Sequence, residues 1–188
     1  MPRILGIDPG LTRCGVGVID LQASRKVSLV EVDVFRSQPN LALEERIGLI
    51  GDQLENLIKR VQPAAIALER VYADVNVRSV MGTAQISGVA LLLAHRYGIP
   101  IHLHTPTEVK AAVTGSGRAD KAQVGNMVAK ILGLAEVPKP ADAADSLAIA
   151  ICHAWRSSGA ALPNSTTLTD AQQKWHAAVR AAATKQEG

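Results

Sequence analysis

The hydrophobic pattern of this chain first changes its period after residue 36, and that change limits the choice of fold. Before it, residues 3–8, 14–20 and 26–36 are continuously apolar or alternate with period two, as strands do. After it, apolar residues recur every three or four positions over residues 43–61, as on one side of an amphipathic helix, until Pro63. The sequence therefore predicts a three-stranded antiparallel meander followed by a helix.

The remainder of the chain continues with short apolar runs and helical patterns. Strands are predicted over residues 64–69 and 99–104, and helices over residues 78–97, 106–113, 120–132 and 141–157. This order indicates one α/β domain with a mixed sheet over residues 1–157. Residues 158–188 begin with a stretch of small and polar residues, which predicts a mobile C-terminal tail.

Composition narrows the class of protein. With 188 residues and 47% hydrophobic residues, the chain suits a single packed core. No apolar run is long enough to cross a bilayer and no secretory leader is recognised, so we expect a cytoplasmic protein without a membrane partner. Cys14 and Cys152 lie far apart and are expected to be buried thiols. The net charge of +3 is compatible with a polyanionic partner but does not identify one.

Four acidic residues form the most informative pattern. Asp8 and Glu69 each end an apolar run, where a carboxylate is costly unless something compensates it. Asp142 and Asp145 are three residues apart on a predicted helix and share one side of it. Each acid alone has an ordinary explanation, as a turn former or as a favourable charge at a helix start.

Together, these acids predict a metal site. If the first and fourth strands are neighbours and the last helix crosses their ends, all four carboxylates meet. Carboxylate oxygens are the ligands that Mg²⁺ prefers. Two such ions can activate a water and stabilise the leaving oxygen in a displacement at phosphorus.

Five motifs, in order along the chain, resemble the RuvC family of bacterial crossover junction endodeoxyribonucleases. They are Gly6–Leu11 with Cys14-Gly15, Ala67–Tyr72, Gly82–Gly88, Lys121–Val124 and Ala141–Ala148, and the resemblance runs from residue 4 to about residue 156. It implies a ribonuclease-H-like fold, with a five-stranded mixed sheet flanked by helices. It also implies a homodimer that binds a four-way (Holliday) junction and nicks two strands of like polarity during recombination and repair. Two Mg²⁺ per active site, replaceable by Mn²⁺, and cooperation with the branch-migration helicase complex are further implications.

The resemblance assigns roles to particular residues. The metal-binding acids of the family fall on Asp8, Glu69, Asp142 and Asp145, and family lysines fall on Lys110 and Lys121. Lys121 stands near a predicted helix start, where the helix dipole disfavours a cation, so an anionic neighbour is expected. We therefore expect Lys121 to contact the scissile phosphate or a water held by metal. A solvated lysine is the alternative.

Other residues are candidates for holding DNA. Tyr72 stands where the family often has phenylalanine, and its ring is equally suited to stack on unpaired bases or to pack beneath its loop. Candidate phosphate contacts are Arg70, Asn76, Arg78, Lys110, Arg118 and Lys121. Each of them, taken alone, is also an ordinary surface side chain.

Other functions fit part of the pattern. The Gly-x-Asp-x-Gly turn also resembles the phosphate loop of actin-like ATPases and sugar kinases, which need two lobes; ATP binding would support that function. A dimeric module that grips DNA branches without cutting has no reason to gather four acids. A nuclease for RNA or for another branched structure would use the same metal site and stays open. His102 and His104 share one side of a strand, but nothing nearby completes a ligand set, so a packed or solvated pair is expected.

Overall fold

The computed structural model describes residues 1–71 and 77–160. Its five strands are β1 (Arg3–Asp8), β2 (Arg13–Leu21), β3 (Val27–Arg36), β4 (Ala65–Glu69) and β5 (Ile101–His104). They form one sheet in the order β3-β2-β1-β4-β5. Strands β1, β2 and β3 pair antiparallel, whereas β4 pairs parallel with both β1 and β5. The predicted meander and the mixed five-stranded sheet are therefore confirmed.

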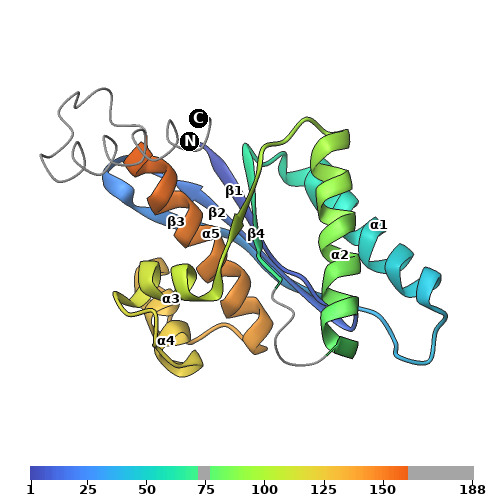
Figure 1. Cartoon of the computed structure of the whole chain (residues 1–188). Coiled ribbons are helices and arrows are strands. Elements are labelled where there is room, and N and C mark those ends of the chain that lie inside the picture. The colour runs from blue at the N-terminus through green and yellow to red at the C-terminus, as the bar shows by residue number, and fades with distance from the viewer. Residues whose placement is uncertain (72–76, 161–188) are drawn as a thin grey trace, which may run out of the picture. The chain divides into compact units, whose positions relative to one another are not determined.

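Five helices flank the sheet (Figure 1). They are α1 (Leu43–Val61), α2 (Val77–Arg96), α3 (Pro106–Thr114), α4 (Lys121–Leu132) and α5 (Ala141–Ala160), and a short 3-10 turn, Ala23–Arg25, precedes β3. Their ends follow local chemistry. The chain leaves α1 through Gln62 in the left-handed region, and the side chains of Thr105 and Asp120 cap the first turns of α3 and α4.

The two sides of the sheet carry different cores. Helices α1 and α2 cover one side, and α3, α4 and α5 cover the other (Figure 1). On β1, Leu5 and Ile7 belong to the α1–α2 core, whereas Ile4 belongs to the α5 core. Because strand side chains alternate, Asp8 points to the same side as Ile4, toward α5.

Glycines on that side let α5 lie directly on the sheet backbone. A Cβ atom added at Gly6 would lie 2.1 Å from the carbonyl oxygen of Ser146, and one at Gly15 would lie 2.1 Å from that of Asp142. At Gly17 it would lie 2.8 Å from the Leu147 side chain. This close approach brings the beginning of α5 to the ends of β1 and β2.

Three further observations concern single residues and segments. Cys14 and Cys152 are buried free thiols, as expected. On α2, a Cβ at Gly82 would lie 3.0 Å from Leu11 in the β1–β2 turn, whereas Gly88 has open space beside it. Within residues 1–71 and 77–160, no helix combines the length and the apolar character needed to cross a membrane.

Candidate active site

The four acids come from three elements that meet at one end of the sheet. Asp8 is the last residue of β1 and Glu69 the last of β4, and these two strands are parallel neighbours. Asp8 also lies opposite Gly15 on β2, and Gly15 touches the backbone of Asp142 at the start of α5. Asp145 follows one helical turn later on the same side of α5. The structure therefore brings the four acids together.

The charges of these acids interact strongly. Burial, followed by repulsion from Glu69, Asp145 and Asp142, raises the pKa of Asp8 to about 8, and Lys121 partly opposes this rise. Burial and the charge of Asp145 likewise raise the pKa of Glu69. Because Asp8 is hard to ionise beside the other three acids, this end of the sheet lacks enough positive charge to balance its carboxylates.

Two lysines supply part of that charge on one side of Asp8. The Nζ atom of Lys121, the first residue of α4, lies 3.2 Å from Oδ2 of Asp145. The charge of Asp145 and this hydrogen bond raise the pKa of Lys121. Lys110 on α3 lies nearby, and its charge offsets part of the rise in the pKa of Glu69. A cavity of about 260 Å³ is lined by these two lysines together with Asp8, Glu69 and Asp145. Lys121 therefore has the anionic neighbour that its position at a helix start predicted.

An arginine that the sequence did not single out lies on the other side of Asp8. Nε of Arg13, at the start of β2, lies 3.2 Å from Oδ2 of Asp142. Both residues line a wider groove of about 840 Å³, which also contains Asp8 and Arg46. No spacing or motif marked Arg13, because the contact depends on how α5 lies across β2.

The acids are not gathered into a preformed cage. Among the residues that the structure describes, no three His, Cys, Asp or Glu side chains are close enough to hold a metal ion as they stand. Instead, Asp142 pairs with Arg13 and Asp145 with Lys121. Even so, Oδ2 of Asp142 is buried and accepts no hydrogen bond from a described residue. A buried oxygen without a donor, among crowded acids, fits a hard divalent cation.

The candidate DNA contacts are distributed around this end of the sheet. Arg70 follows β4 and is exposed, and its backbone N–H donates to the carbonyl of His104 at 2.8 Å. Arg118 is also exposed and lines a separate hollow of about 450 Å³ beside Gln123. Tyr72, Asn76 and the side chain of Arg78 lie outside the described residues.

The histidines form a packed cluster. His104 is buried, and its Nε2 atom lies 3.2 Å from Nδ1 of His153 on α5. His102 stacks on His153, with 4.5 Å between ring centroids. Burial, and then the neighbouring histidines, lowers the pKa of His153 to about 4, so His153 is neutral at pH 7, and burial also lowers the pKa of His104. His104 is therefore packed, whereas His102 is exposed and stacks on His153, so the two histidines split between the packed and solvated alternatives.

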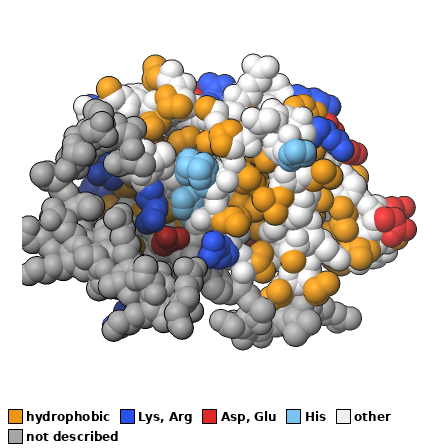
Figure 2. Space-filling model, turned by 45° about the horizontal axis from the view of Figure 1, so that its top comes forward, with side chains coloured by type: hydrophobic (Ala, Val, Ile, Leu, Met, Phe, Trp, Pro, Cys, Tyr) orange, Lys and Arg blue, Asp and Glu red, His pale blue; other side chains and the backbone are white. Residues whose placement is uncertain are grey.

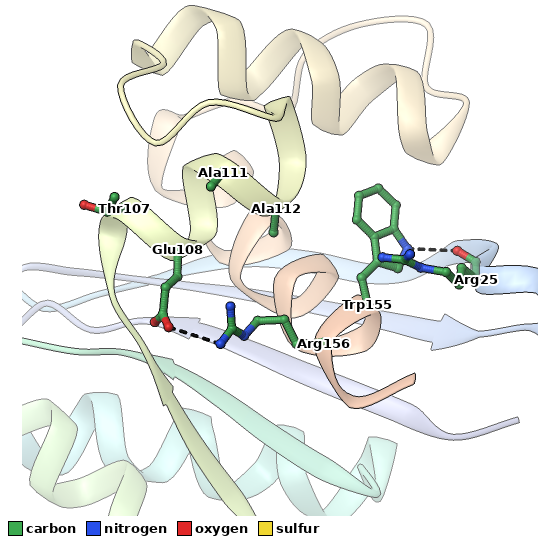
Figure 3. Close-up of a pocket in the computed structure, with 7 residues that line it drawn as sticks. All are labelled: Arg25, Thr107, Glu108, Ala111, Ala112, Trp155 and Arg156. Atoms are coloured by element: carbon green, nitrogen blue, oxygen red, sulfur yellow. Dashed lines mark hydrogen bonds and ion pairs between the residues drawn. The ribbon is translucent and has the colours of Figure 1, made fainter. Parts of the chain in front are cut away.

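A second hollow, of about 400 Å³, lies between α3, α5 and the turn before β3 (Figure 3). Its charged groups are already satisfied by one another. Arg156 pairs with Glu108 at 3.2 Å. The indole N–H of Trp155 donates to the backbone oxygen of Arg25 at 2.8 Å, and the Arg25 guanidinium lies 5.6 Å from the centroid of the Trp155 ring. Unlike the acidic site, this hollow needs no additional charge.

The mixed five-stranded sheet with flanking helices, together with the likeness to solved RuvC structures, confirms the predicted ribonuclease-H-like fold class. The family described as "Crossover junction endodeoxyribonuclease RuvC" matches residues 4–153. The chain therefore belongs to the RuvC family, a family of nucleases that depend on divalent metal ions.

Individual relatives agree with this membership. The RuvC protein of Leifsonia xyli is 55% identical over 194 residues, covering 96% of this chain and 93% of the relative. That of Clavibacter michiganensis is 59% identical over 155 residues, covering 82% of this chain and 77% of the relative. Thermus thermophilus RuvC, solved in complex with a Holliday junction substrate, superposes with a TM-score of 0.81 at 33% identity, covering 85% of this chain and 97% of that one.

Proposed function

We propose that this chain resolves four-way (Holliday) DNA junctions during recombination and repair. It does so by hydrolysing one phosphodiester bond in each of two strands of like polarity. Membership of the RuvC family supports this proposal, as does the likeness to the Thermus protein in complex with a junction. The observation that carries it is the meeting of Asp8, Glu69, Asp142 and Asp145 beside two lysines.

These four acids are proposed to hold two Mg²⁺ ions, with Mn²⁺ as a substitute. When bound, two divalent ions supply an activated water and charge stabilisation for the leaving oxygen. The chain supplies the negative charge that holds them, and glycine contacts between α5 and β2 fix where Asp142 lies. Since the pKa of Asp8 is raised to about 8 without an added cation, a bound ion also keeps this carboxyl ionised at neutral pH.

Lys121 is proposed to be the catalytic cation of the site. Its ammonium group lies beside Asp145, at the edge of the cavity where a phosphate would approach the acids. There it would bind a non-bridging oxygen of the scissile phosphate and offset the charge that develops during displacement. Lys110 lines the same cavity and is proposed to hold the same or the adjoining phosphate.

The remaining candidate contacts are proposed to position the junction. Arg70 and Arg118 are exposed at this end of the sheet and are suited to phosphate oxygens. Tyr72, Asn76 and Arg78 belong to the segment that follows β4 and the acid Glu69, and we retain them as proposed contacts with unpaired bases and backbone.

A homodimer is proposed to form through α2. Five exposed apolar or small residues recur along it at spacings of three and four: Met81, Ala84, Gly88, Leu91 and Leu92. Met81 and Leu92 are 55% and 54% exposed, and hydrophobic side chains gather over this part of the molecule (Figure 2). A two-fold dimer would present two identical sites to two equivalent strands. We expect Leu92→Glu to shift the mass in sedimentation from dimer to monomer, whereas Leu49→Glu on α1 should not.

The proposal also covers the domain organisation, the cellular location and a partner of this chain. Residues 1–157 would form the nuclease domain and residues 158–188 a separate tail, in keeping with a family match that ends at residue 153. The protein would act in the cytoplasm, where bacterial chromosomal DNA lies. It would cooperate there with the branch-migration helicase complex.

The direct test is nicking of a synthetic four-way junction. Wild type with Mg²⁺, wild type with a chelator, and Asp8→Asn with Mg²⁺ are compared on the same labelled junction. We expect symmetric paired nicks only in the first reaction, with junction binding retained by Asp8→Asn. Equal cutting in all three reactions would contradict the proposal, and cutting of a linear duplex at the same rate would remove the specificity for junctions.

A further inference from the structure

The groove on the Arg13 side of Asp8 is lined by two arginines, Arg13 and Arg46, and by two acids, Asp8 and Asp142. Arg13 lines it and lies directly opposite Arg36 in the β2–β3 ladder. Like charges in that arrangement repel each other. Arg46 lines the groove from α1, and neither Arg36 nor Arg46 has an acidic partner among the described residues. Once divalent cations bind Asp8 and Asp142, as proposed above, the charges of Arg13 and Arg46 are left without an acidic partner in the groove.

Arg46 is held in place without using its charge. Its Nε atom donates to Oγ of buried Ser37 at 3.0 Å, and its Nη2 atom donates to Oγ1 of Thr12 at 2.8 Å. The Ser37 hydroxyl in turn donates to the backbone oxygen of Leu11, in the turn between β1 and β2. Neutral hydroxyl partners leave the guanidinium charge available to an anion, and a fixed guanidinium loses little entropy on binding one.

Arg13 is placed differently, since it already has an anion. Its Nε atom lies 3.2 Å from Oδ2 of Asp142, yet this oxygen accepts no properly directed hydrogen bond from a described residue. The Arg13 side chain is 54% exposed, whereas that of Asp142 is only 20% exposed, so Arg13 loses little on returning to solvent but leaves a buried carboxylate oxygen that needs another cation. Arg13 can therefore leave Asp142 at small cost when a cation of higher charge arrives.

We propose that this groove binds a backbone phosphate of the strand being cut, next to the scissile one, and that Arg13 exchanges partners there. In the metal-free protein Arg13 pairs with Asp142. When a divalent cation binds Asp142, the Arg13 side chain is released from this carboxylate. It can then bind the phosphate together with Arg46 and Thr12. Metal binding and DNA binding are thereby coupled through the Arg13 side chain. This inference rests on the proposed function, because the groove ends at Asp8 and Asp142.

The test compares Arg13→Gln with a matched control, Arg46→Gln, which removes the same charge from the same groove but touches no acid. Mn²⁺ binding to the DNA-free protein is measured first, by titration calorimetry. We expect Arg13→Gln to bind Mn²⁺ about three- to tenfold more tightly than wild type, because the competing cation is gone. Arg46→Gln should match wild type within about twofold.

Junction affinity is then measured with Ca²⁺ and with a chelator, and the recovered DNA is checked for nicks. With Ca²⁺, both variants should bind about three- to tenfold more weakly than wild type, and the slope of log affinity against log salt should decrease by about one. With the chelator, only Arg46→Gln should be weaker, because Arg13 is then held by Asp142.

The measurements test the partner exchange and the phosphate site separately. Unchanged or weaker Mn²⁺ binding by Arg13→Gln would overturn the exchange. Junction binding equal to wild type for both variants in Ca²⁺ would overturn the phosphate site. If wild type itself fails to bind the four-way junction, the proposed function is at fault rather than this inference. Thermal melting of each variant checks that it is folded.

Discussion

The two sides of the central sheet are packed by different means. On the α1–α2 side, large side chains such as Leu54 and Ile58 interlock with Leu5 and Ile7 of β1 and are fully or almost fully buried. On the α5 side, glycines of β1 and β2 let the helix backbone touch the strand backbone. Both arrangements bury apolar surface, but only the second fixes the main chain of a helix relative to a strand.

The difference separates stability from site geometry. Side chains in the first core can shift slightly without moving a carboxylate, since all four acids lie on or face the other side. In the glycine contact, Gly15 lies opposite Asp8 and against the backbone of Asp142. A displacement there moves one acid relative to another.

The largest effect is expected from Gly15→Ala. Its new Cβ atom would lie 2.1 Å from the carbonyl oxygen of Asp142, so the start of α5 must move away. Displacing a catalytic group by about 1 Å costs on the order of a hundredfold in rate. We therefore expect junction nicking to fall by about a hundredfold or more in preparations that still fold by circular dichroism. Nicking within about threefold of wild type would show that α5 does not set the geometry.

Leu54→Ala tests the opposite side of the sheet. Leu54 is fully buried, and its truncation should lower the free energy of unfolding by roughly 2–5 kcal/mol in urea titrations. At a temperature where the variant is folded, we expect its nicking rate to remain within about threefold of wild type. A loss of nicking comparable to that of Gly15→Ala would abolish the distinction between the two sides.

The pH dependence of stability reports on the acids themselves. Because the folded-state pKa of Asp8 is about 8 and its ordinary value is 3.8, its ionisation disfavours the metal-free fold. The stability present below about pH 4 is therefore lost progressively as the pH rises toward about 8. We expect the Tm of metal-free wild type to fall between about pH 5 and about pH 8, and Asp8→Asn to melt a few degrees higher at the upper end.

The variant Asp20→Asn is a matched control for this titration, because the hydrogen bond from Arg3 lowers the pKa of Asp20. A lowered pKa favours the fold above the ordinary pKa, so Asp20→Asn should lose a little stability at neutral pH rather than gain it. Added Mg²⁺ should raise the Tm of wild type and of Asp20→Asn but not that of Asp8→Asn. Equal pH slopes for wild type and Asp8→Asn would contradict the placement of Asp8 among the other acids.

The smallest effect is expected from Gly48→Ala on α1. Nothing lies within 4 Å of a Cβ atom at this position, and alanine is the better helix former. In urea titration the free energy of unfolding should rise by about 0.5–1 kcal/mol, and the rate of junction nicking should be unchanged. A loss of activity here would show that glycine replacement harms the protein in general rather than at the α5 contact.

Most of the fold could be predicted from the sequence because local patterns determine it. The switch from period two to period three or four located the three-stranded meander and α1, and Pro63 marked the end of that helix. The predicted metal site required β1 and β4 to be neighbours, and the structure shows them as a parallel pair. Element ends differ from the prediction by one or two residues at most places, where capping decides the boundary.

The site was only partly predictable. Asp8 and Glu69 stood out because each ends an apolar run, Asp142 and Asp145 because of their spacing on a predicted helix, and Lys121 because of its place at a helix start. Arg13 and Arg46 carry no such local mark, and their importance depends on tertiary contacts with Asp142 and Ser37. Glycines at alternate positions on β2, Gly15 and Gly17, were a usable signal for close approach of a helix.

The central claim is that Asp8, Glu69, Asp142 and Asp145 form one site for divalent cations. Anomalous diffraction from crystals soaked in Mn²⁺ tests it most directly. We predict manganese peaks at the Asp8 carboxylate, with Asp142 and Asp145 turned from Arg13 and Lys121 toward the ions, and no such peaks in Asp8→Asn crystals. Manganese bound only elsewhere, with both ion pairs intact at saturating metal, would contradict the claim.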